Sequence, residues 1–367
     1  MPDVRSRRLV WAATLLEKGL TMSASRRRFL KTAVALGGVA LSRRAEGWSP
    51  QSSGPNAVFA APSVARVPPA QGTNHPLPTA AEVNEWYTTR RNWGRWGAND
   101  EIGAVNMITA EKRRAATDLV RNGKTVSLSR VFEPPQHFVR KNDRGDGAGS
   151  VVDYYGFIYH GQTITHIDAL CHIWEKESDG VWQGRAPDEA VDTHGAAFGA
   201  ITAWSDGIIT RGVLLDVPRY RGEPHVTSDK PVHGWELEEI ASAQGIDVRP
   251  GDALMVHSGR EAFQRAGGTF GGGDRPGLHV SCAKFIRDHD VSLLGWDMMD
   301  ARPDQYGLRY PVHGVLPYYG VALLDNALLE PLANACAEER RYEFMFMLLP
   351  LKVARGTGSP ANPIAMF

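Results

Sequence analysis

Residues 160–172, with the sequence HGQTITHIDALCH, hold the densest group of potential metal ligands in the chain. Side chains alternate between the two faces of an extended chain, whereas a helix would spread the same residues around its circumference. A strand here would put four residues on one face: His166, Asp168, Leu170 and His172. A histidine and a carboxylate two residues apart on one face can bind one divalent ion, because neutral imidazole nitrogen and carboxylate oxygen suit Zn or Mn.

The neighbours of His166 and Asp168 have distinct expected roles. His172 lies further along the predicted strand, so we expect it near the ion rather than on it, as a general acid or base. Either histidine alone would be interpreted as a solvent-facing residue or a hydrogen-bonded core residue. All three polar residues together favour a metal site, because charged and imidazole groups seldom line an apolar strand. Cys171 would point to the opposite face, and we predict a buried, unreactive thiol there.

The composition excludes several classes of protein. The 367 residues are 43% hydrophobic, which is enough for a large core without covalent cross-links. Three cysteines without CxxC spacing provide neither a disulfide framework nor a zinc knuckle. Residues 1–60 contain 10 Lys/Arg and 3 Asp/Glu, which leaves 31 and 38 for the rest of the chain. This acidic body argues against nucleic acid as a partner, because phosphate contacts need clustered Lys and Arg.

The N-terminal region has the pattern of an export signal. Residues 25–31 (SRRRFLK) are followed by an uncharged run over 32–41, which is about half the roughly 20 residues that a membrane-spanning helix needs. The pattern resembles a twin-arginine signal, so we expect residues 1–60 to direct export of the folded chain to the periplasm or beyond. Met22 is a possible true start, and Ala60 or Ala61 a plausible cleavage point. After removal of the signal, no stable membrane span is expected.

A linker over residues 61–78 and one domain over 79–367 are expected to follow. Residues 61–78 are rich in Pro and Ala without apolar periodicity. Thr79 and Glu82 form a capping-box pattern that predicts a helix through Tyr87. Beyond it, short apolar runs alternate with helical patterns, which indicates an α/β or α+β domain. The predicted strands are 125–132, 154–159, 212–217, 253–257, 291–296, 321–324 and 343–350; the predicted helices after residue 87 are 109–123, 235–244, 259–266, 281–288 and 328–339.

The segment THIDALCH over residues 165–172 resembles the THxDxPxH core of the cyclase family of metal-dependent hydrolases, which includes kynurenine formamidases and isatin hydrolases. The resemblance implies a single α/β domain of the swivelling β/β/α type, with a mixed sheet and flanking helices. It also implies a homodimer or homotetramer. Further matching segments follow the family's order: 93–106, 206–216, 249–252, 295–300 and 356–363.

The resemblance also implies further metal ligands. In kynurenine formamidases, a histidine and a glutamate twelve positions later complete the metal cluster. His313 and Asp325 have this separation and become ligand candidates. Without the family, the residues around His313 indicate a turn, and Asp325 indicates an ordinary helix cap.

The chain departs from the family where another metal-binding histidine is expected. That position holds Gln162, and a neutral amide is a poor ligand for Zn. His160 lies two residues earlier and is a possible substitute, so both residues are candidates for the metal site or the pocket. We therefore expect one ion rather than two. Asp325 is also one methylene shorter than the glutamate that the family has.

The expected function is hydrolysis of an amide, lactam or related carbonyl bond by metal-activated water, with arylformamidase-like chemistry as one possibility. His172 would transfer the protons, and a small molecule would be the substrate. An exported binding protein that holds the same ion without turnover is the alternative. A purely structural metal site would need four protein ligands, which the Gln162 substitution works against.

Overall fold

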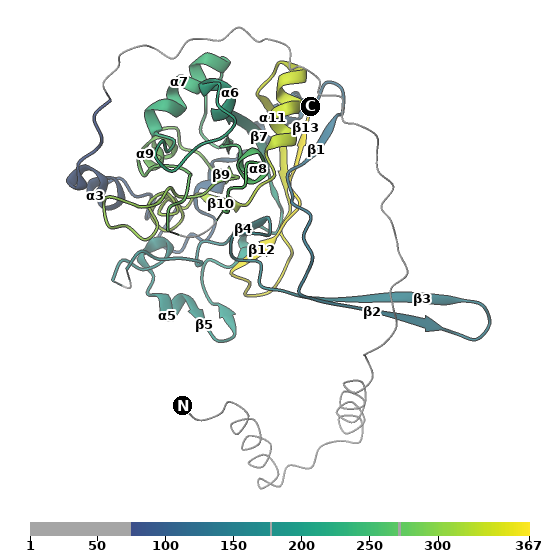
Figure 1. Cartoon of the computed structure of the whole chain (residues 1–367). Coiled ribbons are helices and arrows are strands. Elements are labelled where there is room, and N and C mark those ends of the chain that lie inside the picture. Colours follow the sequence, from purple (N-terminus) through teal and green to yellow (C-terminus); the bar gives the residue numbers. More distant parts are fainter. Residues whose placement is uncertain (1–74, 177, 271–272) are drawn as a thin grey trace, which may run out of the picture. The chain divides into compact units, whose positions relative to one another are not determined.

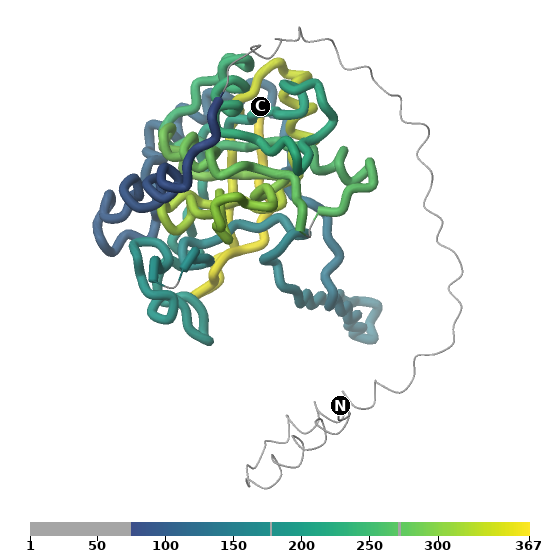
Figure 2. Tube along the Cα trace, turned by 60° about the vertical axis from the view of Figure 1, so that its left-hand side comes forward, coloured from purple at the N-terminus to yellow at the C-terminus, as the bar shows by residue number. Residues whose placement is uncertain are grey.

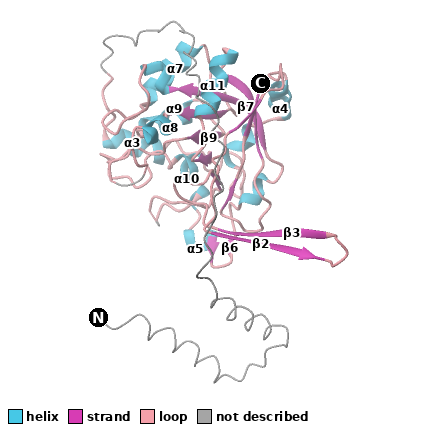
Figure 3. Cartoon of the chain, turned by 45° about the vertical axis from the view of Figure 1, so that its right-hand side comes forward, coloured by secondary structure: helices cyan, strands magenta, loops and turns pink. Residues whose placement is uncertain are grey.

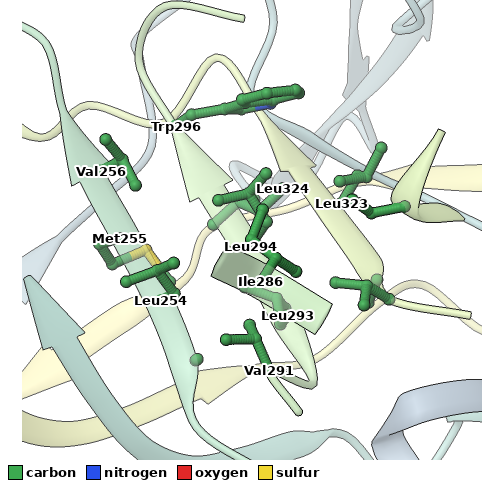
Figure 4. Close-up of a cluster of buried hydrophobic side chains, with 14 of the residues drawn as sticks. Leu254, Met255, Val256, Ile286, Val291, Leu293, Leu294, Trp296, Leu323 and Leu324 are labelled. Atoms are coloured by element: carbon green, nitrogen blue, oxygen red, sulfur yellow. The ribbon is translucent and has the colours of Figure 1, made fainter. Parts of the chain in front are cut away.

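Four parallel strands form the centre of the sheet in the computed structural model, which describes residues 75–176, 178–270 and 273–367. The strands are adjacent in chain order: β7 (Ile208–Asp216), β8 (Ala253–His257), β9 (Leu293–Trp296) and β10 (Ala322–Asp325). Their sequences are nearly continuous apolar runs, as expected for parallel strands that are covered on both faces. Figure 4 shows the result, with side chains of β8, β9 and β10 packed together with Ile286 of a covering helix.

Antiparallel strands extend the sheet on both sides. Beyond β7 lie β11 (Glu343–Leu348), β13 (Ile364–Met366) and β1 (Thr125–Ser127). Beyond β10 lie β4 (His166–Asp168) and β12 (Gly358–Pro360). The nine strands therefore form one mixed sheet, which confirms the α/β class expected from the sequence.

The C-terminal segment, yellow in Figure 2, shows that this sheet is curled. Only residues 361–363 separate β12 at one edge from β13 near the other edge. The four Cα–Cα steps from Pro360 to Ile364 can span at most about 15 Å. In a flat sheet the two strands would be about 34 Å apart, at roughly 4.8 Å per strand. The two edges must therefore approach each other.

Helices cover both faces of the sheet. In Figure 3, α7, α8 and α9 lie on one side and α4 lies on the other. The helices are α3 (Ala80–Thr88), α4 (Ala110–Thr117), α5 (Pro187–Ala190), α6 (Val217–Arg221), α7 (Gly234–Gln244), α8 (Arg260–Arg265), α9 (Ser281–Asp288), α10 (Val315–Tyr319) and α11 (Glu330–Glu339). Short 3-10 turns occur at Gly103–Met107, Trp182–Gly184 and Ile201–Trp204.

The predicted capping box at the start of α3 is present. The Thr79 side chain accepts a hydrogen bond from the Glu82 backbone at 3.2 Å, and the Glu82 carboxylate accepts one from the Thr79 backbone at 2.7 Å. The predicted bounds of α9 and β8 agree with the structure. Two other predictions were too long: the first strand ends at Ser127, and the helix that begins at Ala110 ends at Thr117.

A two-stranded hairpin differs most from the prediction. It pairs β2 (Gln136–Asp143) with β3 (Gly149–Gly156) and extends away from the rest of the domain in Figure 1. The predicted strand at 154–159 was placed too late, and β2 was not predicted. Both faces of the hairpin are exposed, so the burial that produces an alternating apolar pattern is absent. A further short pair joins β5 (Val191–Asp192) and β6 (Gly195–Ala196).

The predicted export signal lies outside the described residues, as does most of the predicted linker. Residues 75–78 of the linker are described and lead without regular structure into α3. No helix in the described part of the chain is both long and apolar enough to span a membrane.

Candidate metal centre

The pairing of β4 with β10 assembles the first group of candidate ligands. Asp325, the last residue of β10, lies directly opposite His166, the first residue of β4. Asp168 follows two residues later and therefore shares the face of His166. One donor atom from each of the three side chains lies within 4.8 Å of the others, and all three residues are buried. The sheet register thus brings together residues that are far apart in sequence.

A second group shares Asp168. His160 Nδ1 lies 2.9 Å from Asp168 Oδ1, and His172 Nε2 lies 3.7 Å from the same oxygen. The two imidazole rings stack in parallel with their centroids 3.8 Å apart. Both side chains remain about one quarter exposed, at 22% for His160 and 24% for His172, so this side of the cluster is open to solvent.

The route by which His172 reaches the cluster differs from the prediction. The predicted strand through residue 172 was wrong, because β4 ends at Asp168. A turn follows, in which the His172 backbone N–H donates to the Ala169 carbonyl at 2.9 Å. Leu170 is buried in the core rather than aligned with the polar residues. His172 therefore approaches Asp168 through the turn and not through strand alternation.

His313 reaches the cluster through Asp325. Its Nε2 lies 3.3 Å from Asp325 Oδ2, and its Nδ1 contacts Asp300 Oδ2. Asp300 Oδ1 also accepts the backbone N–H of Val312 at 2.6 Å and that of His313 at 3.2 Å. Asp300 therefore holds both the ring and the backbone of His313.

Buried hydrogen bonds orient the other candidate ligands. His166 Nδ1 lies 2.8 Å from the Ile164 carbonyl, which can only accept, so Nδ1 carries a proton and Nε2 is the nitrogen that faces Asp168. The indole N–H of Trp296 donates to Asp325 Oδ1 at 2.5 Å. The other carboxylate oxygen of Asp325, Oδ2, faces His313 Nε2. No motif or spacing predicted the role of Trp296. Asp300 was identified only as the last residue of the family-matching segment 295–300, after a predicted strand.

Electrostatic interactions hold the cluster in distinct protonation states. Burial opposes the charge on Asp168, but the imidazoles of His172, His160 and His166 keep the pKa of Asp168 well below its usual value. Burial opposes the charge on His166 as well, yet hydrogen bonding and attraction to Asp168 raise its pKa to about 9. For His172 the effect of burial outweighs the attraction of Asp168, and the pKa is lowered. His172 is therefore neutral at pH 7 and able to accept a proton.

The arrangement of these atoms fits a divalent cation. Asp168 Oδ1 lies within 4 Å of ring nitrogens from His160, His166 and His172. Nevertheless, Asp168 Oδ1 and His160 Nδ1 are buried without a well-formed hydrogen bond. Two donors on a tetrahedral ion at 2.0–2.1 Å are about 3.3 Å apart. The observed separation of His166 Nε2 and Asp168 Oδ1 is 3.3 Å. Histidine nitrogen with carboxylate oxygen is the donor set that Zn and Mn accept.

Two other residues of the 160–172 stretch have different surroundings. The Gln162 backbone carbonyl accepts a hydrogen bond from Arg260. His160, rather than Gln162, belongs to a group with metal-binding spacing. Cys171 is buried, and burial raises the pKa of its thiol to about 12, in agreement with the expected unreactive thiol.

Comparison with known proteins identifies the family. The profile described as "Putative cyclase" matches residues 104–302, which is more than half of the chain. The chain therefore belongs to the cyclase family, as the THIDALCH segment predicted.

One solved structure of this family agrees with the fold, and two others show a more distant similarity. A crystal structure of "a novel cyclase" is 28% identical, with a TM-score of 0.65, and the match covers 76% of this chain and 99% of that one. An isatin hydrolase bound to the product analogue thioisatinate is 15% identical over 70% of this chain and 98% of that one, with a TM-score of 0.44. A predicted metal-dependent hydrolase from Bacillus stearothermophilus is 14% identical over 67% and 98%, with a TM-score of 0.41. No curated protein gives a significant match.

Proposed function

We propose that this protein is a metal-dependent hydrolase that cleaves an amide, lactam or related carbonyl bond. The observation that supports it most is the convergence of three imidazole nitrogens on Asp168 Oδ1, which has no well-formed hydrogen bond of its own. Buried polar atoms without partners are costly, and a bound cation would satisfy them. Membership of the cyclase family agrees with this use of the cluster.

The candidate ligands are His166, Asp168 and Asp325, with His160 beside Asp168 and His313 beside Asp325. A divalent ion in such a site supplies a Lewis acid, which acidifies a water molecule and polarises a carbonyl group. Ion binding must displace the proton that the raised pKa of His166 retains, so affinity should increase with pH.

His172 is the proposed proton acceptor. It is neutral at pH 7, it is partly exposed, and its Nε2 is the most distant of the three nitrogens around Asp168 Oδ1. From this position it can take a proton from water and return it to the leaving amine or alcohol. Asp168 would hold the protonated ring by charge attraction.

Metal analysis of the full chain, purified without chelator, tests the proposal. The wild type should contain Zn or Mn, or take it up on addition, and Asp168→Asn should not. Asp216→Asn is the matched control, since Asp216 is a buried carboxylate 2.9 Å from His257 Nδ1 and outside the two metal groups. A wild type that binds no added Zn or Mn would refute the metal centre. Equal binding by Asp168→Asn would refute the ligand assignment.

Activity measurements on a panel of lactams and aryl formamides complete the test. His172→Ala should retain the metal and lose turnover of any substrate that the wild type hydrolyses. Wild-type turnover in this variant would reject His172 as the proton acceptor. Saturable ligand binding by the metal-loaded wild type without product would favour the exported binding protein instead.

We also propose that the protein is exported through its twin-arginine pattern. Replacement of Arg26, Arg27 and Arg28 by Lys should leave the chain in the cytoplasm, as measured by cell fractionation. Periplasmic recovery of this variant would reject the proposal. A homodimer or homotetramer remains the expectation for the assembly, and sedimentation measures it directly.

A further inference from the structure

A short loop over residues 161–165 connects two cluster histidines, His160 and His166. Three of its backbone carbonyls accept hydrogen bonds from side chains outside the loop. The Asn326 amide donates to the Gly161 carbonyl at 2.7 Å and to the Ile164 carbonyl at 3.0 Å. Arg260 donates to the Gln162 carbonyl. Two side chains thus fix the loop along most of its length.

Asn326 lies in a conformation that suits this task. It directly follows Asp325, it is fully buried, and its φ of 55° lies in the left-handed region that asparagine tolerates better than most residues. Arg260, also buried, donates to Asn326 Oδ1 at 2.7 Å. Because this contact requires the amide oxygen to face Arg260, the amide NH2 group must face the loop.

The Asn326 side chain and the His166 ring share one acceptor, the carbonyl oxygen of Ile164. The Ile164 carbonyl accepts from Asn326 Nδ2 at 3.0 Å and from His166 Nδ1 at 2.8 Å. The second contact sets the tautomer and orientation of His166. Displacement of this carbonyl would therefore turn the His166 ring and change the direction of its Nε2 lone pair.

We propose that Asn326, oriented by Arg260, is a positioning residue that holds the 161–165 loop so that His160 and His166 face Asp168. The inference depends on the proposed metal centre. The new element is that metal affinity depends on Asn326 and Arg260, which belong to neither group of candidate ligands. Loss of such a supporting contact typically weakens metal binding by 10- to 100-fold.

Asn326→Asp tests the proposal with minimal change of shape. An aspartate can still accept from Arg260, but its second oxygen cannot donate to the two loop carbonyls and would repel them. Asn92→Asp is a closely matched control. Asn92 is buried, its amide donates to the Tyr319 carbonyl at 3.0 Å, and its oxygen faces Arg95 at 3.4 Å.

The measurement is the dissociation constant of the full chain for Co2+ and Zn2+, obtained by chelator competition, together with the Co2+ absorption spectrum. Asn326→Asp should bind at least tenfold more weakly than the wild type and show an altered spectrum. Asn92→Asp should keep the wild-type affinity and spectrum even where its melting temperature falls. Wild-type affinity in Asn326→Asp, or an equal loss in Asn92→Asp, would overturn the proposal.

A second variant covers the case in which Asn326→Asp does not fold. Asn326→Gly tolerates the left-handed backbone and removes the whole side chain, including the amide, without adding a charge. The same tenfold loss is expected for it, and unchanged affinity would overturn the proposal. A wild type that binds no metal would instead reject the metal centre itself, so the two failures are distinguishable.

Discussion

Substitution of Gly358 by alanine tests how the last strand of the sheet makes room for the cluster. Gly358 pairs with Asp168 across β12 and β4, so an added Cβ would point to the face that carries the candidate ligands. This atom would lie 2.6 Å from the Ile167 carbonyl oxygen and 2.8 Å from His160 Cε1. Ordinary contacts begin at 3.4 Å, so the His160 ring would have to move by about 0.6 Å, and β12 would have to move as well.

The expected cost follows from this crowding. Added methyl groups in packed interiors typically cost about 1–3 kcal/mol, and we expect this loss in urea unfolding of the metal-free chain. His160 Nδ1 is only 2.9 Å from Asp168 Oδ1, so the same shift should weaken Zn affinity by about tenfold. Gly273→Ala is the control, because its Cβ would meet nothing within 4 Å and its φ lies outside the left-handed region that disfavours alanine. Gly358→Ala with wild-type stability and affinity would refute the steric argument.

Three further predictions concern protonation, a buried ion pair and metal removal. Burial lowers the pKa of His279 from 6.5 to about 4, so its stabilising contribution is complete above pH 6.5 and is lost as the pH falls toward 4. By pH 5 this effect should lower the unfolding free energy of the wild type, measured in urea, by about 2 kcal/mol. In His279→Gln the unfolding free energy should fall by about 2 kcal/mol less over the same pH range. Asp252 is fully buried between Lys112 at 2.6 Å and Arg211 at 3.0 Å, so Asp252→Ala should destabilise the chain by about 3–5 kcal/mol; a loss below about 1 kcal/mol would contradict this. Free Zn at one hundred times its dissociation constant should raise the unfolding free energy of the wild type by about 2.7 kcal/mol, and addition of EDTA should remove this gain. Asp168→Asn should show no such difference.

The central strands and the long helices were predictable because their burial is visible in short windows of sequence. The aliphatic runs at 253–257 and 321–324 lie within the sheet centre, and the pattern at 281–288 matches α9. The hairpin was predicted poorly because neither face is buried, and strand pairing alone imposes no apolar alternation.

The candidate site was predictable only in part. The spacing of His166 and Asp168 indicated their shared face, whereas Asp325 came from the family resemblance alone. Its position opposite His166 depends on strand register between distant segments, which local sequence does not encode. The approach of His172 was also mispredicted, since periodicity assumed that the strand continues and the structure has a turn after Asp168. The supporting roles of Asn326 and Arg260 arise from side-chain contacts with backbone carbonyls, which have no sequence signature.

The strands β12 and β13 have a consequence for the order of events during synthesis. Both come from residues 358–366, and they join opposite sides of the curled sheet. A ribosome makes the N-terminal segments first, so β4, with His166 and Asp168, cannot pair with β12 until residues 358–360 have been translated. The sheet, and with it the final environment of the cluster, can therefore be completed only after residues 358–366 have been synthesised. Deletion of residues 358–366 should prevent this completion.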